Sequence, residues 1–244
     1  SIELREVLAA HAVLAAVTAR TDLWESHAAA LRRLGARVRT GDALYATFGR
    51  GAVGPKLALL PALDAAVERM GGIDVCVNCA GIVIGEKTLG REGPHRLDGF
   101  RRTIEVNLIG SFNVLRLAAA EMARNGRAED NGVIVNTASI AAFDGQAGQA
   151  AYAASKAGIA GMTLPIARDL ARSAIRVCAI APGIFGTPML RGLPAEIQDS
   201  LAAEVTNPKR LGDPQEYARL AAFIVENAYL NGETIRIDGA LRMR

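Results

Sequence analysis

The residues with the clearest chemical potential are Tyr152 and Lys156, four positions apart in Tyr152-Ala153-Ala154-Ser155-Lys156. In a helix this spacing places a phenol and an ammonium on one face, which can also be an ordinary solvated face. A free phenol has a pKa of about 10, so its use as a base near neutral pH requires a pKa lower by about two to three units. One ammonium at about 4 Å supplies roughly 4 kcal/mol at an effective dielectric constant of about 20. The pair therefore predicts an acid–base phenol activated by a neighbouring cation.

Two other polar residues can serve that phenol. Ser139 follows the apolar run Gly132 to Thr137, and its hydroxyl is suited to holding a substrate oxygen, although a serine considered alone at a strand end is usually a turn residue. Asn107 interrupts an apolar stretch, and it is either part of the site or a core amide that distorts its helix. With the phenol and the ammonium, these residues outline a candidate site.

The elements that must position these residues follow from composition and periodicity. The chain has 244 residues, 50% hydrophobic and 22% charged, which suits a large α/β domain and excludes disordered and collagen-like classes. Short apolar runs alternate with Ala- and Arg-rich amphipathic stretches, without a repeat or a Pro/Ser-rich linker. We therefore predict a single α/β domain over residues 1–244, a Rossmann-like, doubly wound parallel sheet with helices on both faces.

The apolar runs predict strands, and the amphipathic stretches predict helices. The predicted strands are Ala12 to Thr18, Arg37 to Thr40, Lys56 to Leu60, Ile73 to Asn78, Gly132 to Thr137, Ile175 to Ala181 and Glu233 to Ile237. The predicted helices are Leu23 to Leu34, Pro61 to Met70, Leu97 to Asn125, Ala151 to Arg172 and Pro214 to Glu226. In such a sheet, ligands bind beyond the carboxyl ends of the strands, which is where Ser139 falls.

Charge and cysteine usage narrow the function classes. Lys and Arg total 28 against 25 Asp and Glu, and these charges are interspersed, so a nucleic-acid-binding surface is not expected. No apolar run approaches the roughly 18 to 20 residues that span a bilayer, and the first apolar run lacks a basic flank, so we expect a cytoplasmic protein. Cys76, Cys79 and Cys178 lie in apolar runs and are expected in the core, and no metal site is predicted.

A set of short motifs follows in order along the chain. They are Asn78-Cys79-Ala80-Gly81, Asn107-Leu108, Ser139, Tyr152-x-x-x-Lys156, and Pro182-Gly183 followed by Thr187. In order and spacing they resemble the short-chain dehydrogenase/reductase family. From about Leu63 to Arg244, runs such as Arg210-Leu211-Gly212-Asp213-Pro214 are still more similar to one subfamily, the type II 3-hydroxyacyl-CoA dehydrogenases, also called type 10 17β-hydroxysteroid dehydrogenases.

The resemblance implies hydride transfer between a secondary alcohol and a nicotinamide cofactor. It makes Tyr152 the acid–base residue, and it makes Lys156 the residue that lowers the pKa of that phenol and holds the nicotinamide ribose. It also implies that Ser139 orients the substrate oxygen, that Asn107 anchors a proton-relay water and that Gln146 lines the substrate pocket. The implied cofactor-binding residues at these motifs are Cys79, Ala80, Gly81, Tyr152, Lys156, Phe185 and Thr187.

The sequence departs from the family near its amino terminus. A Gly-rich turn after the first strand lets a diphosphate approach the next helix in the family, whereas here Thr18, Asp22 and Trp24 stand at the glycine positions and Leu23 keeps the apolar residue between the last two. Asp42 falls where an acidic residue favours NAD over NADP, although it can also be a turn carboxylate. The departure is either a divergence that weakens NAD binding or an error or frame change in residues 1 to about 62, and peptide mapping distinguishes the two.

These observations lead to one expected function and one alternative. We expect an NAD-dependent oxidoreductase that interconverts a 3-hydroxyacyl-CoA, or a similar hydrophobic secondary alcohol, with its ketone. We also expect a homotetramer whose contacts include Asn231 to Arg244. The alternative is a cofactor-poor scaffold or binding subunit, since relatives of this subfamily also serve in an RNA-processing complex. Leu190 to Thr206 is expected to form a substrate lid or a plain surface helix. The basic residues of Gly85 to Arg102 are expected to meet an acyl-CoA phosphate or to be solvated.

Overall fold

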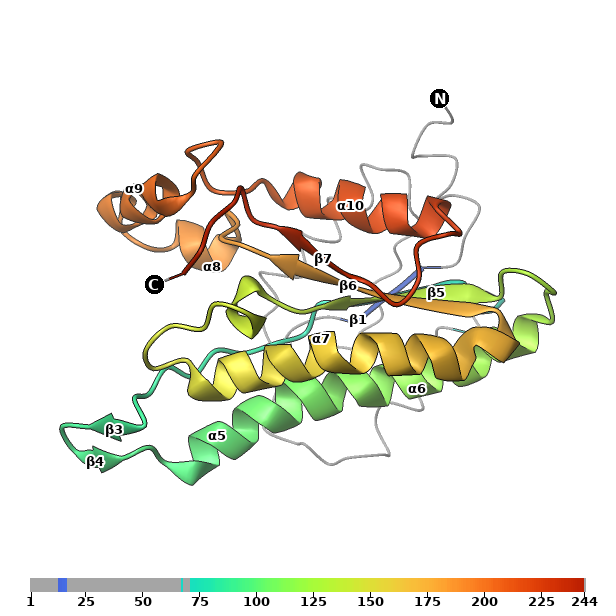
Figure 1. Ribbon diagram of the computed structural model, residues 1–244, viewed down its shortest axis with the longest axis horizontal. Coiled ribbons are helices and arrows are strands. Elements are labelled where there is room, and N and C mark those ends of the chain that lie inside the picture. The colour runs from blue at the N-terminus through green and yellow to red at the C-terminus, as the bar shows by residue number, and fades with distance from the viewer. Residues whose placement is uncertain (1–12, 17–66, 68–70, 244) are drawn as a thin grey trace.

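The computed structural model describes residues 13–16, 67 and 71–243, and these contain a five-stranded parallel sheet (Figure 1). The strand order is β1-β2-β5-β6-β7, and each neighbouring pair is parallel. Parallel neighbours cannot be joined by tight hairpins and need crossover connections. The strands are β1 Val13–Ala16, β2 Val75–Asn78, β5 Gly132–Thr137, β6 Ile175–Pro182 and β7 Thr234–Ile237. The predicted α/β fold with a parallel sheet is confirmed.

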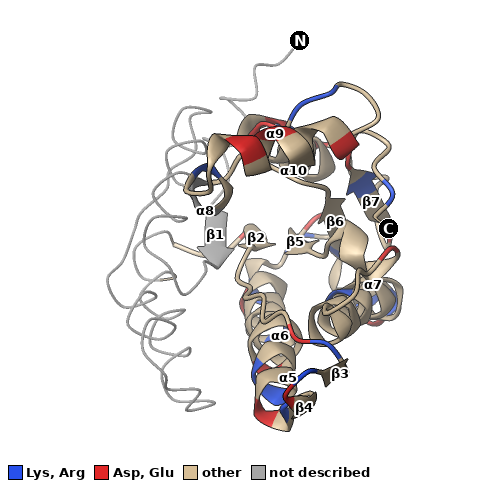
Figure 2. Cartoon of the chain, turned by 90° about the vertical axis from the view of Figure 1, so that its left-hand side faces the viewer, with Lys and Arg blue, Asp and Glu red and all other residues tan. Residues whose placement is uncertain are grey.

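Helices cover both faces of this sheet. The views in Figures 1 and 2 place α6 and α7 on one face and α10 on the other, with α5 extending α6 toward the edge where the strands end. The helices are α5 Leu97–Ile104, α6 Gly110–Met122, α7 Ala150–Leu170 and α10 Pro214–Glu226. This is the layered arrangement expected when helices form the crossovers of a parallel sheet.

Consecutive apolar residues of the strands face two separate core layers. Ile134 of β5 packs in the layer that contains Leu115 of α6, whereas Val133 and Val135 pack in the layer that contains Ile224 of α10. Ile134, Val135 and Ile224 are fully buried. Side chains alternate between the two faces of a strand, so a strand that is apolar at successive positions must be covered on both sides.

The single helix predicted over Leu97 to Asn125 is wrong in one respect, because it is interrupted. A π-helical segment, Glu105–Ile109, separates α5 from α6, and the last turn, Ala123–Asn125, is a 3-10 helix. In the π-helical segment Gly110 N donates to Glu105 O, five residues back, which widens the helix locally. Apolar periodicity does not encode this widening, which surrounds Asn107.

The last helix, α10, begins and ends where the sequence predicts. Ahead of Pro214 at its first position, the Asp213 side chain accepts from Gln215 N at 2.9 Å and the Glu216 side chain accepts from Asp213 N at 2.8 Å, which completes a capping box. At the other end, the buried Arg176 of β6 donates to four backbone carbonyl oxygens in and after the last turn. Backbone N–H groups at the start of the helix and carbonyl oxygens at its end therefore have hydrogen-bond partners outside the helix itself.

Some other elements differ from the sequence prediction, and some predicted elements fall outside the residues that the structure describes. A hairpin that was not predicted, β3 Leu89–Gly90 and β4 Gly93–Pro94, projects beside α5 (Figure 1). The segment expected as a lid or surface helix holds α8 Pro188–Arg191 and α9 Ala195–Glu204. Outside the described residues lie the predicted strands Arg37 to Thr40 and Lys56 to Leu60 and the predicted helices Leu23 to Leu34 and, apart from residue 67, Pro61 to Met70.

The structure also bears on the expectations that the cysteines lie in the core and that no segment spans a membrane. Cys76 and Cys178 are buried free thiols in the two core layers, and the half-buried Cys79 packs against the layer that contains Cys178. Within the described part of the chain, every helix is too short or too polar to cross a lipid bilayer.

Candidate active site

The candidate site lies at the edge of the sheet formed by the carboxyl ends of β2, β5 and β6, which are neighbours in the sheet. Residues 79–81 follow β2, Ser139 follows β5, and residues 183–187 follow β6. Figure 2 looks onto this edge, with the strands in a row between α10 and the pair α6 and α7. Because the strands are parallel, segments far apart in the sequence meet at this edge.

Tyr152 and Lys156 lie in the first two turns of α7 and reach this edge. The Lys156 side chain is buried, and its Nζ donates a hydrogen bond of 2.8 Å to the carbonyl oxygen of Thr137 at the end of β5. The same Nζ lies 5.8 Å from the centroid of the Tyr152 ring. The four-residue spacing therefore brings the half-buried phenol and the ammonium to one side of the helix.

The pKa values of this pair depart from the sequence-based expectation. Burial raises the pKa of Tyr152 above its usual range, and a side-chain hydrogen bond with Ser139 opposes that rise only in part. Burial also lowers the pKa of Lys156 to about 8, an effect that the nearby Cys79 opposes. The expected lowering of the Tyr152 pKa is thus wrong for the described residues, because desolvation of the phenolate dominates. At neutral pH the phenol is protonated and can donate its proton.

Ser139 lies two residues after the end of β5 and is hydrogen-bonded to Tyr152. It is buried and caps the 3-10 helix Ile140–Ala142, where its Oγ accepts from Ala141 N at 3.1 Å. Because the hydroxyl accepts from the backbone, its own proton is free for donation to an oxygen in the site. The turn therefore fixes Oγ and leaves a donor directed at the phenol.

The Asn107 amide is fully buried in the π-helical segment and is occupied by hydrogen bonds. Its Oδ1 accepts from Ile82 N at 2.8 Å and its Nδ2 donates to Ile82 O at 2.9 Å. The same Nδ2 donates to Ser155 Oγ at 3.0 Å. Asn107 therefore holds the segment after β2 against α7, so it is both a helix-distorting amide and a part of the site.

Ser155 is a site residue that the sequence reasoning missed. It is fully buried between Tyr152 and Lys156, and its Oγ donates to the Tyr152 carbonyl oxygen at 2.7 Å while accepting from Asn107. The signal was present, since Ser155 is the hydroxyl residue within the Tyr–Lys motif. Its partner could not be identified, because Asn107 lies 48 residues away along the chain.

Thr137 and Tyr217 form a second polar group that was missed. The Thr137 Oγ1 and Tyr217 OH lie 2.6 Å apart, and Thr137 Oγ1 donates to Cys79 Sγ at 3.6 Å. Burial raises the pKa of Tyr217 well above its usual range, and burial also raises the pKa of the Cys79 thiol. The group therefore stays neutral and fixes the ends of β2 and β5 beside the carbonyl that holds Lys156.

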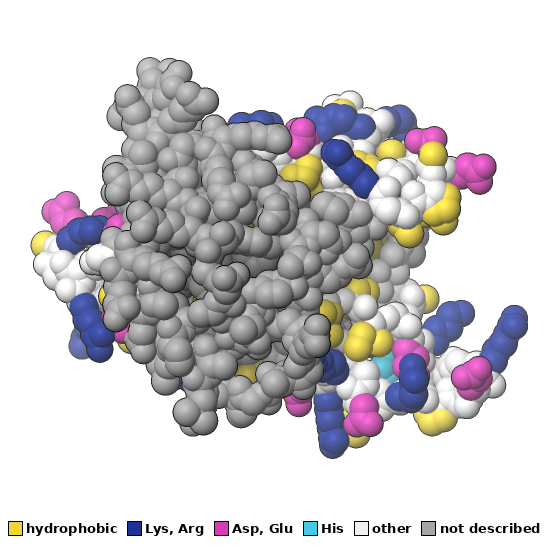
Figure 3. Space-filling model, turned by 180° about the vertical axis from the view of Figure 1, so that it is seen from behind, with side chains coloured by type: hydrophobic (Ala, Val, Ile, Leu, Met, Phe, Trp, Pro, Cys, Tyr) yellow, Lys and Arg dark blue, Asp and Glu magenta, His cyan; other side chains and the backbone are white. Residues whose placement is uncertain are grey.

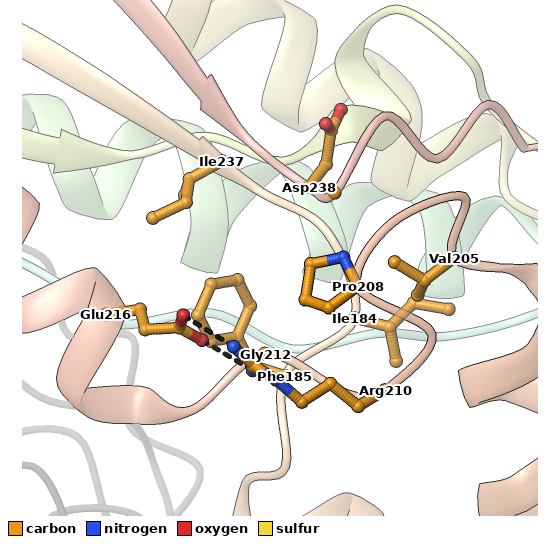
Figure 4. A pocket seen from close by; sticks show the side chains of 10 residues that line it. Ile184, Phe185, Val205, Pro208, Arg210, Gly212, Glu216, Ile237 and Asp238 are labelled. Atoms are coloured by element: carbon orange, nitrogen blue, oxygen red, sulfur yellow. Dashed lines mark hydrogen bonds and ion pairs between the residues drawn. The ribbon is translucent and has the colours of Figure 1, made fainter.

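Phe185 and Thr187 lie in the loop that follows β6. Gly186 N donates to Gly212 O at 2.8 Å, and the Phe185 ring packs so closely on Gly212 that a Cβ there would lie 2.8 Å from it. Behind this loop is a cavity of ≈ 80 Å³ whose lining includes Phe185 and the ion pair of Arg210 with Glu216 (Figure 4). Ligand pockets usually occupy about 300–1,000 Å³, so this cavity is too small for a dinucleotide.

Gln146 lies in the connection between Ser139 and α7. Its Oε1 accepts from Gln149 Nε2 at 3.3 Å, and its backbone N–H donates to Gln149 Oε1 at 3.2 Å. Its side chain is half-buried. The structure therefore places Gln146 beside Gln149, the residue that precedes α7.

The described residues fit the nicotinamide end of a dinucleotide. A Cβ at Gly81 would lie 3.4 Å from both Asn107 Oδ1 and Lys156 Nζ, so the missing side chain keeps the backbone accessible beside the ammonium. Within the described residues Lys156 Nζ has one acceptor, Thr137 O, and an ammonium has three donors, which leaves donors for the hydroxyls of a ligand. Leu23 and Asp42, which are expected to contact the other end of the cofactor, lie outside the described residues.

Three comparisons with known proteins agree with one another. A family profile described as enoyl-(acyl carrier protein) reductase matches residues 12–241. The chain is 58% identical over 187 residues to a Bos taurus protein named 3-hydroxyacyl-CoA dehydrogenase type-2, which covers 75% of this chain and 72% of the relative. It is 39% identical over 181 residues to the 3-oxoacyl-(acyl-carrier-protein) reductase FabG of Thermotoga maritima, covering 73% of this chain and 70% of that protein. A crystal structure of 3-hydroxyacyl-CoA dehydrogenase type-2 from Mycobacterium avium matches with a TM-score of 0.83 and 36% identity, covering 100% of this chain and 99% of that one.

Proposed function

Because the chain belongs to the short-chain dehydrogenase/reductase family and is an oxidoreductase, we propose that it interconverts a 3-hydroxyacyl-CoA and a 3-ketoacyl-CoA with NAD as its cofactor. The observation that carries this proposal is the meeting of Ser139, Tyr152 and Lys156 at the carboxyl edge of the sheet. The names of similar proteins support an acyl thioester as the substrate. We propose that this activity resides in a single domain.

Several residues of the carboxyl edge would hold the cofactor. Lys156 and Tyr152 would bind the nicotinamide ribose, Phe185 and Thr187 would meet the nicotinamide, and residues 79–81 would border it. Bound there, the nicotinamide supplies or accepts the hydride. The choice of NAD over NADP is supported by Asp42, whose carboxylate would accept hydrogen bonds from a ribose diol and disfavour a 2′-phosphate.

Proton transfer is assigned to Tyr152. The phenol is protonated at neutral pH because burial raises its pKa, so it would donate its proton to the carbonyl oxygen of a ketoacyl substrate. Ser139 would donate a hydrogen bond to the same oxygen. Lys156, whose pKa is about 8, is cationic at neutral pH and would stabilise the phenolate that remains. In the opposite direction the same oxygen of Tyr152 takes the proton of the alcohol. Asn107 is proposed to anchor the proton-relay water through its Oδ1, which accepts one hydrogen bond from Ile82 N and has a second lone pair.

The charged corner formed by the hairpin and α5 supports an anionic substrate. In Figure 3, Lys and Arg side chains project from the lower right of the molecule, the corner at which β3 and β4 lie, with Asp and Glu side chains between them. Within the described residues Arg96 pairs with Glu86 at 3.2 Å, whereas Lys87 and Arg91 are exposed without an ion pair. We propose that basic residues here contact the phosphates of an acyl-CoA, with Gln146 lining the pocket closer to the reacting carbon. The basic residues are Lys87, Arg91, Arg96, Arg101 and Arg102.

We also propose that the protein is a homotetramer. Exposed large apolar side chains on the π-helical segment, α6 and α7 support assembly, since Ile109 is 56% exposed and Phe112 and Leu164 are each 45% exposed. Light scattering after size-exclusion chromatography measures the mass of the assembly. A mass of one or two chains would contradict the proposal.

The proposed function is tested by NADH titration followed by turnover of a 3-ketoacyl-CoA. Wild-type protein should bind NADH saturably and oxidise it when the thioester is added. Tyr152→Phe should bind NADH but lose about 10²- to 10⁴-fold of kcat, because the proton donor is missing. The matched control is Tyr229→Phe, which removes the hydroxyl of a tyrosine that is 99% exposed and should leave kcat unchanged.

Two results would count against the enzyme. Wild-type protein that binds no NADH would favour the scaffold alternative. It would also favour a sequence divergence in residues 1–62 that weakens cofactor binding. Turnover that survives Tyr152→Phe would show that the phenol is not the proton donor.

A further inference from the structure

We propose that Arg236 is a positioning residue that holds the loop of residues 143–149 in place for substrate binding. The loop joins the turn that carries Ser139 to the helix that carries Tyr152, and it contains Gln146. The proposal rests on the proposed function, since it concerns the substrate side of the same site. It assigns a role in that site to β7, the last strand in the order β1-β2-β5-β6-β7.

Arg236 is the centre of a network that joins three segments. Its Nη2 binds Asp144 Oδ2 at 2.5 Å and the Leu241 carbonyl oxygen at 3.1 Å, and its Nε binds Asp238 Oδ2 at 2.7 Å. The guanidinium also lies 5.4 Å from the centroid of the Phe143 ring. One side chain therefore connects the end of β7 and the segment after it to two residues of the 143–149 loop.

The burial of these groups separates this network from an ordinary surface ion pair. The side chains of Arg236, Asp144 and Asp238 are 23%, 18% and 8% exposed. Ion pairs in full solvent contribute little, because water screens them and the side chains lose entropy. Here the Arg236 guanidinium holds the pKa of Asp144 below its usual range, through the hydrogen bond first and the charge second. Asp144 is thus an ionised acceptor fixed by a planar donor.

The 143–149 loop starts from the 3-10 turn, where Phe143 N and Asp144 N both donate to Ile140 O. Two further contacts join the loop to other segments, and Arg236 supplies one of them. On the hairpin side, Glu86 N donates to Gly148 O at 2.9 Å. On the β7 side, the side-chain contact is Asp144 with Arg236. Gln146 lies between these two attachments. Removal of the Arg236 contact should therefore allow the middle of the loop to move away from the site while Gly148 stays attached.

Such a movement predicts weaker substrate binding with little change in chemistry. Ser139 is fixed by its own 3-10 turn, and Tyr152 is fixed in α7 through Ser155, so neither depends directly on Arg236. A change that weakens ground-state and transition-state binding equally raises KM and leaves kcat unchanged. This split distinguishes a positioning role from general damage to the fold.

The test compares Arg236→Gln, Asp144→Asn and the double variant in 3-ketoacyl-CoA reduction. Each single variant should raise KM about tenfold, with kcat within about twofold of wild type. The KM of the double variant should not exceed that of the more affected single variant, because both changes remove the same contact between Asp144 and Arg236. The matched control is Arg242→Gln. Arg242 binds Asp238 at 3.2 Å in the same network and acts on Asp144 only through its charge, the smallest of the effects on the pKa of that carboxyl, so its KM should stay within about twofold of wild type.

A second readout needs no substrate. Phe143 is 53% exposed, so chymotrypsin can cleave after it once the loop moves, and cleavage there should be faster in Asp144→Asn and Arg236→Gln than in wild type or Arg242→Gln. Unchanged KM in Asp144→Asn, which keeps the volume of the side chain, would overturn the proposal, and so would cleavage rates equal to wild type. If wild-type protein shows no turnover, the proposed function fails while the cleavage rates still decide whether Arg236 holds the loop.

Discussion

Asn107 Nδ2 donates a hydrogen bond of 3.0 Å to Ser155 Oγ, which joins the π-helical segment to the first turns of α7. Both residues are fully buried. Ser155 Oγ donates onward to the carbonyl oxygen of Tyr152 at 2.7 Å, so the amide that holds Ile82 also bears on the turn that carries the phenol. The segment after β2 and the proposed proton donor are therefore parts of one hydrogen-bonded unit.

Replacement of Ser155 by alanine should impair both stability and turnover. The change leaves one N–H of the buried Asn107 amide without an acceptor, at a cost of about 1–3 kcal/mol of unfolding free energy. It also frees the first turn of α7, so we expect kcat to fall about tenfold. Urea unfolding and steady-state kinetics measure the two effects. Thr163→Ala is the control, since the buried Thr163 hydroxyl binds Ile159 O within the same helix, and it should lower stability without lowering kcat.

Gly81→Ala should weaken cofactor binding while the protein stays folded. The added Cβ would lie 3.4 Å from Asn107 Oδ1 and Lys156 Nζ, which the fold tolerates, but it would occupy the backbone face proposed for the nicotinamide. We expect the Kd for NADH to rise about tenfold in a fluorescence titration. Gly132→Ala provides the contrast, because its Cβ would lie 2.8 Å from the backbone oxygen of Asp74. That variant should lose about 1–3 kcal/mol of stability and bind NADH normally once folded.

Lys156→Met should change how stability depends on pH. Burial lowers the pKa of Lys156 from 10.5 to about 8, so between these pH values the unfolded chain binds more protons than the folded one. The wild type should therefore gain stability as pH rises through this window, up to about 3 kcal/mol, and the methionine variant should lack that gain. Urea unfolding of both proteins at about pH 7 and about pH 10 checks this prediction. Parallel pH profiles for the two proteins would contradict it.

Arg176→Met should destabilise the protein without altering the site. The change removes the donor to four carbonyl oxygens at and after the end of α10, of which, within the described residues, only Asn227 O keeps a backbone partner, Leu230 N, so we expect a loss of about 2–4 kcal/mol. Thermal and urea unfolding measure that loss. Arg168→Met, at an exposed position of α7, should stay within about 0.5 kcal/mol of wild type. Equal stability of the two variants would show that the capping role is wrong.

The sequence by itself determined the features that depend on local geometry. Tyr152 and Lys156 share a side of α7 because the helix turns every 3.6 residues. The strand from Gly132 to Thr137 is apolar at successive positions, so it had to be covered on both faces. Asp213 followed by Pro214 and Glu216 set the start of α10 through a capping box. These features are encoded within a few residues, which is why their boundaries could be predicted closely.

Only the tertiary structure decided which distant groups meet and what their surroundings do to them. Asn107 is hydrogen-bonded to Ser155 across 48 residues of sequence. Thr137 is hydrogen-bonded to Tyr217 across 80 residues, and Arg236 to Asp144 across 92 residues. These meetings depend on the strand order β1-β2-β5-β6-β7 and on the widened turn around Asn107, neither of which has a local pattern. The raised pKa of Tyr152 follows for the same reason. The shared side of Tyr152 and Lys156 could be anticipated from the helix, but the desolvation that outweighs the Ser139 hydrogen bond arises only when the whole chain packs around the phenol.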